Sequence, residues 1–195
     1  MNLQHQLIRE VFDRLAILSE AEWQLFASKL RNKSYAKGDF LLKEGEVENQ
    51  LKFIIKGTVR LFTSNSKQED ISLGFASEGS FCSAYGSFVM RSPSKIVIEA
   101  LEAVEVLCIG YDDLQMLYGY SHTGERLGRI NAEMYLSHKE EREIFLLTMS
   151  AKERYLDLMN RNPRLFDLVK LEHIATFLGI TPQSLSRIRK DIKET

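Results

Sequence analysis

The chain has 195 residues, 44% of them hydrophobic and 27% charged, which is enough for one or two small domains with their own cores. It has no apolar run of 18 residues and no signal peptide, so a soluble, cytoplasmic protein without a membrane partner is expected. Two separate cysteines, Cys82 and Cys108, exclude a disulfide framework and a four-thiolate iron–sulfur cluster, and the net charge of −1 does not by itself indicate a nucleic-acid binder.

Residues 7–30 are predicted to form two helices at the edge of a domain. Ser19 followed by Glu22 is a capping box, which predicts that the second helix begins just after Ser19. Apolar residues recur at helical spacing on both sides of this cap: Leu7, Val11, Leu15, Leu18, Trp23, Phe26 and Leu30.

Residues 33–109 are predicted to be mainly β-structure. Six short runs are rich in branched and aromatic residues, over 40–42, 51–55, 58–62, 71–75, 96–100 and 104–109. Glycine-containing turns separate several of these runs. The near-regular spacing predicts a small antiparallel barrel or roll, whose interior can hold one small ligand.

A short helix is predicted over 111–117, with a break at 119–121, and a long helix over about 123–147. At ~1.5 Å per residue the long helix spans roughly 35–40 Å, which exceeds one small core. Its apolar stripe is interrupted by a polar middle at His138 and Glu141. The stripe consists of Leu127, Ile130, Met134, Ile144 and Phe145.

Ser150 and Glu153 form a second capping box, which predicts a helix over 151–160 and a hinge over 147–150. Residues 168–190 then read as two short helices around a tight turn. Gly179 is expected to end the first helix, Thr181 to cap the second, and Pro182 to occupy its first position. Inward-facing apolar residues recur through both helices: Leu171, Ile174, Ala175, Leu178, Leu185 and Ile188.

The predicted outward face of the second helix is polar and basic. It carries Gln183, Ser184, Arg187 and Lys190, within residues 164–195 that hold six Lys/Arg against four Asp/Glu. Gln can pair with adenine and Arg with guanine, whereas Ser and Lys suit phosphates. An amphipathic hairpin with a solvated face is the alternative. The cap, the glycine break and the polar face occur together, which favours a DNA-reading helix-turn-helix.

The order of motifs along the chain resembles the Crp–Fnr family of bacterial transcription regulators. These motifs are KGDFLLKEGE, FIIKGTVRLF, IVIEALEAVEVLCI and HIATFLGITPQSLSRIRK. The resemblance implies an α+β fold with an N-terminal cyclic-nucleotide-binding-like β-roll, a long dimerisation helix and a C-terminal helix-turn-helix domain. The expected division is 1–120 for the roll with its N-terminal helices, 121–149 for the dimerisation helix and hinge, and 150–195 for the DNA-binding domain. No C-terminal wing is evident.

The family's phosphate-binding cassette is degenerate in this sequence. Gly79 is present, but Ser80 stands where Glu is expected, and Ser94 and Lys95 stand where Arg-Ser is expected. Arg91 lies three residues too early. Without a carboxylate for the ribose and an arginine fork for the phosphate, cyclic AMP binding in the usual manner is not expected.

Other ligands and cofactors receive little support. The central helix offers Lys139 and Glu140 where the family offers Thr or Ser to the nucleotide base. Cys82 is read as a small buried apolar residue rather than a redox sensor. No cofactor and no metal are expected, which leaves either an unidentified effector or none.

The resemblance implies a role for several polar residues of the C-terminal helices. Gln183 and Arg187 match base-reading positions, and phosphate contacts are implied for Lys170, Thr181, Ser184 and Lys190. The stripe from Leu127 to Phe145 would join two copies, so a homodimer on near-palindromic duplex DNA is expected, with RNA polymerase left open as a further partner. A ligand-sensing module without DNA binding is the alternative. An enzyme is not expected, because no catalytic cluster or metal motif such as HExxH occurs.

Overall fold

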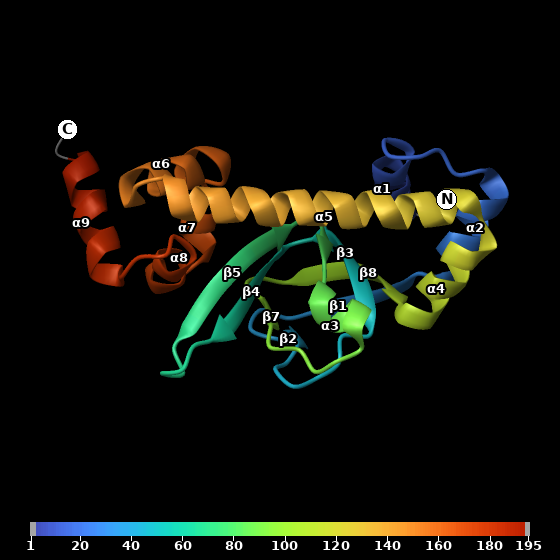
Figure 1. Ribbon diagram of the computed structural model, residues 1–195, viewed down its shortest axis with the longest axis horizontal. Helices are drawn as coiled ribbons and strands as arrows, with labels where there is room; N and C mark the ends of the chain where they lie inside the picture. Colours follow the sequence, from blue (N-terminus) through green and yellow to red (C-terminus); the bar gives the residue numbers. More distant parts are fainter. Residues whose placement is uncertain (1–2, 194–195) are drawn as a thin grey trace. The chain divides into compact units, whose positions relative to one another are not determined.

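The computed structural model describes residues 3–193, in which two helices precede a β-sheet region and a helical C-terminal part (Figure 1). The helices are α1 (Leu3–Asp13), α2 (Glu20–Lys29), α3 (Tyr85–Met90), α4 (Tyr111–Tyr120), α5 (His122–Thr148), α6 (Ala151–Arg161), α7 (Leu165–Leu168), α8 (Leu171–Phe177) and α9 (Pro182–Lys193). The strands are β1 (Arg31–Tyr35), β2 (Phe40–Leu42), β3 (Gln50–Lys56), β4 (Thr58–Ser64), β5 (Asp70–Ser77), β6 (Phe81–Cys82), β7 (Val97–Ala100) and β8 (Val104–Gly110).

The strands form two four-stranded sheets with the orders β1-β8-β3-β6 and β2-β7-β4-β5. One hydrophobic cluster, the inner core, takes side chains from both sheets and therefore lies between them. Its buried members are Leu41, Leu42, Ile54, Val59, Cys82, Ala84, Ile98, Ala100, Val104, Val106 and Cys108. The sheets and the space between them are called the roll below.

A second cluster, the outer core, covers the other face of the β1-β8-β3-β6 sheet. Residues of α1, α2, α3, α4 and α5 pack there against alternate residues of β3 and β8. Its buried members are Ile8, Phe12, Leu18, Trp23, Phe26, Leu30, Leu51, Phe53, Ile55, Phe88, Leu107, Ile109, Leu114, Leu117 and Leu127. The strand β3 is buried on both faces because it separates the two cores.

Local sequence signals placed most element ends well. The capping box at Ser19 is present, since the Glu22 carboxylate accepts the Ser19 backbone N–H at 2.8 Å and the Ser19 hydroxyl accepts the Glu22 N–H. The box at Ser150 and Glu153 likewise begins α6. The six predicted strands are all present, and so is the long helix, as α5.

Four elements were missed, namely β1, β6, α3 and the short helix α7, and the end of α4 was predicted at residue 117 instead of Tyr120. The strand β1 has the polar sequence RNKSY and gains its conformation by pairing with β8, while β6 has only two residues and α3 begins without a side-chain cap. The predicted break at 119–121 is present, but it is confined to Ser121. Gly119 stays inside α4, and the chain leaves the helix at Ser121 in an extended conformation.

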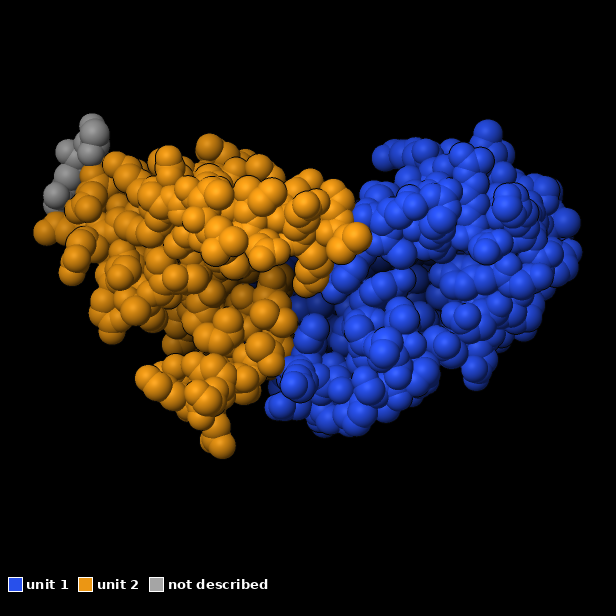
Figure 2. Space-filling model, viewed as in Figure 1, with its two compact units in different colours: residues 1–61, 75–135 blue, residues 62–74, 136–195 orange. Residues whose placement is uncertain are grey.

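The chain divides by its contacts into two units, coloured separately in Figure 2. Unit 1 comprises residues 1–61 and 75–135, and unit 2 comprises residues 62–74 and 136–195. The helix α5 is continuous from one unit into the other. Within residues 3–193, no helix is long and apolar enough to span a membrane.

Candidate functional site

The interior of the roll holds a buried ion pair that the sequence reasoning did not find. The Lys52 ammonium lies 2.6 and 2.8 Å from the two carboxylate oxygens of Glu48, and both side chains are at most 3% exposed. Lys52 alternates along β3 with Leu51 and Phe53 of the outer core, so it points toward the inner core beside Ile54. The sequence signal that could have revealed this ion pair was a lysine within the otherwise apolar run LKFII.

Both cysteines pair in register with this lysine. Lys52 is the cross-strand partner of Cys82 on β6 and of Cys108 on β8, so β3 separates the two thiols. Burial raises the pKa of Cys82 to about 12 and also raises that of Cys108. Because the thiolate is the nucleophilic form, this environment keeps both groups protonated and poorly reactive at neutral pH.

The residues of the degenerate cassette make hydrogen bonds with backbone groups of the protein itself. Ser94 is buried, and its hydroxyl donates to the Ile96 carbonyl at 2.8 Å and accepts the Ile96 N–H at 2.9 Å. Lys95 is exposed, while Ser80 is half-buried. Gly79 donates its N–H to Ile54 in a left-handed turn. The positions that matched the cassette therefore bring neither a carboxylate nor a cation into the roll.

Arg91, which lies three residues before the expected arginine, is held by contacts within the protein. It adopts a left-handed conformation at the end of α3, and its exposed guanidinium donates to the carbonyl of Glu48 at 2.8 Å and to the side chain of Asn49. The same group lies 4.2 Å from the ring centroid of Tyr111. These contacts tie the loop after α3 to the segment before β3.

A further charged residue is buried in the second sheet. Arg60 on β4 is 1% exposed, and its guanidinium lies 3.7 Å from the carboxylate of Glu99 on the neighbouring strand β7. Since Val59 and Leu61 of β4 pack in the inner core, Arg60 faces the opposite side of this sheet. It is therefore not part of the interior of the roll.

The C-terminal helices are built as the local sequence predicts. Ile174, Ala175 and Leu178 are completely buried, and Leu185 of α9 is only 1% exposed. Gly179 joins α8 to α9 with φ +67°, a conformation that glycine adopts without steric cost. Leu171, predicted to face inward, is 38% exposed because it is the first residue of α8.

The start of α9 shows two of the expected features. Pro182 is its first residue, and the Thr181 hydroxyl accepts the Ser184 N–H at 3.2 Å. The Thr181 and Ser184 hydroxyls also lie 3.0 Å apart, so each already has a partner within the protein.

The outward face of α9 brings three of the predicted DNA-contacting residues together. Gln183, Arg187 and Lys190 are all exposed and follow at helical spacing. Lys170 is exposed just before α8, with its ammonium 3.7 Å from the Glu172 carboxylate. None of these contact assignments is tested by the structure, and they remain predictions.

Arg142 of α5 holds the end of α8 within unit 2. Its guanidinium donates to the Phe177 carbonyl and lies 4.0 Å from the Phe177 ring centroid. Burial, with a smaller effect of the nearby Arg154 charge, lowers the pKa of Arg142 to about 10, so it stays charged at neutral pH. A cation near a helix C-terminus interacts favourably with the negative end of the helix dipole. The Arg142 contact therefore stabilises the end of α8 and holds it against α5.

The junction between α5 and α6 is also bridged by an arginine. Arg154 is 9% exposed and donates to the carbonyls of Leu146 and Met149, at 3.0 and 2.7 Å. The predicted hinge at residues 147–150 is therefore spanned by side-chain hydrogen bonds as well as by the capping box.

The predicted dimerisation stripe of α5 is divided between core and surface. Leu127 is buried in the outer core of its own unit, so its side chain is not available at a seam. Met134 and Ile144 are 42% and 54% exposed, and Ile130 and Phe145 are half-buried. Lys139 and Glu140, in the polar middle, are exposed.

Comparison with known proteins agrees with this architecture. Residues 32–120 match the family model of the cyclic nucleotide-binding domain. A search of curated protein sequences finds no match to the chain. Solved structures of similar fold are found.

A putative transcriptional regulator of the Crp/Fnr family from Eubacterium rectale is 16% identical, with a TM-score of 0.73 over 90% of this chain and 84% of that one. The c-di-GMP-responsive regulator CLP of Xanthomonas campestris is also 16% identical, with a TM-score of 0.69 over 90% and 92%. FixK2 from Bradyrhizobium japonicum is 20% identical, with a TM-score of 0.69 over 85% of each chain. The chain thus contains a cyclic nucleotide-binding domain, and its structural neighbours are Crp/Fnr-family regulators.

Proposed function

We propose that this chain, a cyclic nucleotide-binding domain joined to C-terminal helices on a Crp/Fnr regulator fold, is a DNA-binding transcription regulator. In this proposal α8 and α9 are a helix-turn-helix, and α9 enters the major groove. The chain acts as a homodimer on a near-palindromic operator. Cyclic AMP does not control it in the usual manner.

The observation that carries the proposal is the exposed face of α9. Gln183 and Arg187 lie one helical turn apart on that face, while Leu185 anchors the opposite side in the core. Gln and Arg are the side chains that pair bidentately with adenine and guanine in the major groove. Arg142 and Gly179 hold the two helices in place, so the face is presented on a supported element.

The dimer is supported by apolar surface on α5. Met134, Leu136, Ile144 and Leu147 are between 42% and 76% exposed on this one helix. Burial of such side chains against a second copy would stabilise association by about 25 cal/mol per Å² of apolar surface removed from water. Two helix-turn-helix units would then read half-sites ~34 Å apart.

The interior of the roll supports the exclusion of usual cyclic AMP binding. Among the described residues of the inner core and of the Lys52–Glu48 pair, Lys52 carries the one buried ammonium group. The Glu48 carboxylate already neutralises it. A phosphate placed there would compete with that carboxylate and leave a buried charge uncompensated. The cassette offers no arginine to replace Lys52 as the counter-charge.

The proposal is tested by selecting binding sites from a random duplex DNA library with the purified chain, without added ligand, at two salt concentrations. Recovery of a two-fold-symmetric site is the expected result. Recovery of no site, with cyclic nucleotides and cell extract also failing to restore one, would favour a ligand-sensing module that does not bind DNA.

Two substitutions on α9 then separate base reading from phosphate contact. Arg187→Ala should cost about 1–3 kcal/mol of binding free energy and relax the preference at one base pair of each half-site. Lys190→Ala should weaken binding to all sequences alike and reduce the slope of log affinity against log salt.

Lys152→Ala, an exposed change on α6, serves as the control and should leave both properties unchanged. If Arg187→Ala retained full discrimination among operator variants, the assignment of Arg187 to base reading would be wrong. The affinities are measured by fluorescence anisotropy with the selected site and its single-base variants.

A further inference from the structure

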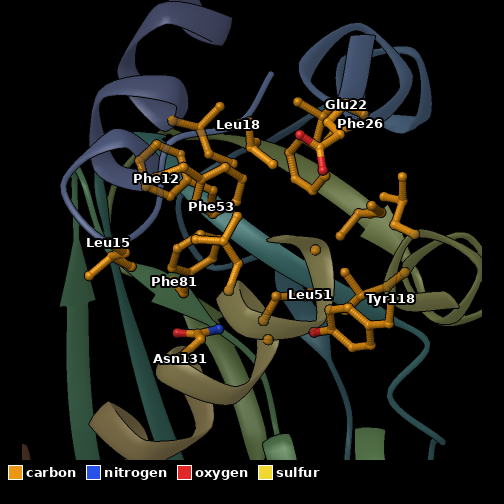
Figure 3. Close-up of a pocket in the computed structure, with 18 of the residues that line it drawn as sticks. Phe12, Leu15, Leu18, Glu22, Phe26, Leu51, Phe53, Phe81, Tyr118 and Asn131 are labelled. Carbon is orange, nitrogen blue, oxygen red and sulfur yellow. The ribbon is translucent and has the colours of Figure 1, made fainter. Parts of the chain in front are cut away.

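Unit 1 contains an apolar cavity that lies outside the roll. It has a volume of about 60 Å³ and lies between the helices α1 and α2, the strands β3, β6 and β8, and the corner formed by α4 and α5. Figure 3 shows Phe12, Phe53 and Phe81 along one wall, with Glu22 and Phe26 at one end. The cavity is separated from the inner core by the β1-β8-β3-β6 sheet.

The walls of the cavity are closely packed. The rings of Phe12 and Phe81 stack at 5.9 Å between centroids, and Phe53 approaches Phe81 at 5.1 Å. On the other side α4 and α5 meet closely at two glycines. A Cβ added at Gly124 would lie 2.7 Å from the Leu117 carbonyl, and one at Gly128 would lie 2.6 Å from the Tyr118 ring. The space is therefore not the result of loosely packed helices.

The size of the cavity limits its occupant. Because one water-sized sphere fills about 10–15 Å³ of such a volume, a cavity of about 60 Å³ has room for several heavy atoms. Apolar cavities of this kind stay dry and lose the dispersion contacts that an apolar occupant would restore. A longer occupant would extend along Leu15 toward the surface, since that side chain is only half-buried.

The few polar groups in the lining select against acids. The Glu22 carboxylate is held by hydrogen bonds from Ser19, and the pKa of Glu22 is lowered to about 2, so it is an anion at neutral pH. Burial raises the pKa of Tyr118 to about 12, so its hydroxyl stays protonated. Figure 3 shows that hydroxyl and the amide of Asn131 on the side of the cavity opposite Glu22.

We propose that this cavity is a binding site for a small, uncharged and mainly apolar molecule, with at most one hydroxyl group to meet Tyr118 and Asn131. Its effect on regulation, which rests on the proposed function, would act through α5. Leu127, Gly128 and Asn131 line the cavity, and α5 continues as one helix to Thr148. An occupant would therefore contact the helix assigned to dimerisation.

Binding is tested on the full chain without DNA, by titrating straight-chain alcohols from ethanol to octanol and following backbone amide shifts by NMR. We expect affinity to rise about fourfold for each added methylene until the cavity is filled. The largest shifts should occur around Leu51, Leu117 and Leu127. Hexanoate, which has the apolar chain of an alcohol but carries an anion, should bind at least tenfold more weakly than hexanol.

Two filling substitutions locate the site. Leu51→Phe and Leu15→Phe should each weaken hexanol binding at least tenfold, and Leu15→Phe keeps the test usable if the buried Leu51 change does not fold. Leu101→Phe, at a buried position that does not line the cavity, is the matched control. Glu22→Gln retains the capping geometry and should reduce the discrimination against hexanoate.

The proposal is overturned if no alcohol binds, or if both filling variants bind hexanol as tightly as the wild type. Equal affinity of the wild type for hexanol and hexanoate would overturn the assigned ligand class. Because these measurements contain no DNA, their failure is distinguishable from failure of the DNA-site selection.

Discussion

The ion pair between Lys52 and Glu48 shows what a single residue contributes inside the roll. Removing two charges from water costs several kcal/mol for each ion, and their mutual attraction offsets this only when both partners are present. Here the ammonium contacts both oxygens of the carboxylate, and the carboxylate also accepts the Gln50 N–H at 3.0 Å. The pair therefore holds the segment before β3 onto the strand itself.

We predict that Lys52→Met lowers the free energy of unfolding by about 3–5 kcal/mol, because it leaves the buried Glu48 without its counter-charge. The double variant Lys52→Met/Glu48→Gln should recover much of that loss, since no uncompensated ion remains. Both are measured by urea denaturation at neutral pH. A single variant as stable as the wild type would show that Glu48 is hydrated or otherwise compensated.

At the scale of elements, the corner between α4 and α5 depends on close helix packing. The ring of Tyr118 on α4 lies against the backbone of α5 at Gly128, where no side chain fits. Gly119, on α4, has open space around its Cβ position and lies in an exposed helical setting. A side chain added at Gly128 would therefore clash, whereas one added at Gly119 would not.

Gly128→Ala should destabilise the chain by about 1–3 kcal/mol, because the new methyl group must displace the Tyr118 ring. Gly119→Ala should instead stabilise it by about 0.5–1 kcal/mol, since alanine loses less backbone entropy in a helix. Thermal and urea unfolding of the two variants provide the comparison. Equal effects of the same sign would contradict this account of the corner.

For the whole molecule, the proposed dimer requires that the exposed residues of α5 be covered. Ile144 is 54% exposed and lies beyond the outer core, which takes Leu127 from the same helix. Ile144→Glu should convert the dimer to a monomer and reduce DNA affinity by at least tenfold, because two linked half-site contacts become separate binding events. Light scattering after size-exclusion chromatography measures the mass.

The matched control is Lys139→Glu, an exposed change of charge on a different face of α5. It should leave the mass unchanged. If Ile144→Glu remained a dimer, the seam would lie elsewhere, and the exposed apolar residues of α5 would need another partner.

A feature could be predicted from the sequence when the residues that determine it lie close together along the chain. The caps at Ser19 and Ser150, the turn at Gly179 and the start of α9 at Pro182 all depend on residues within a few positions of one another. The prediction that the family's cassette is degenerate likewise rests on local residue identity, at Ser80 and the Ser94–Lys95 pair, and it stays a prediction. Such features can be predicted because their chemistry is complete within one short segment.

Tertiary structure decided the features that join distant segments. The polar strand β1 exists because residues 31–35 pair with 104–108, and Leu127 left the predicted seam because helices far away in sequence cover it. The Lys52–Glu48 pair became buried, and the apolar cavity formed, only when sheets and helices closed around them. Local pattern records which face of an element is apolar, but burial is a property of what that face meets.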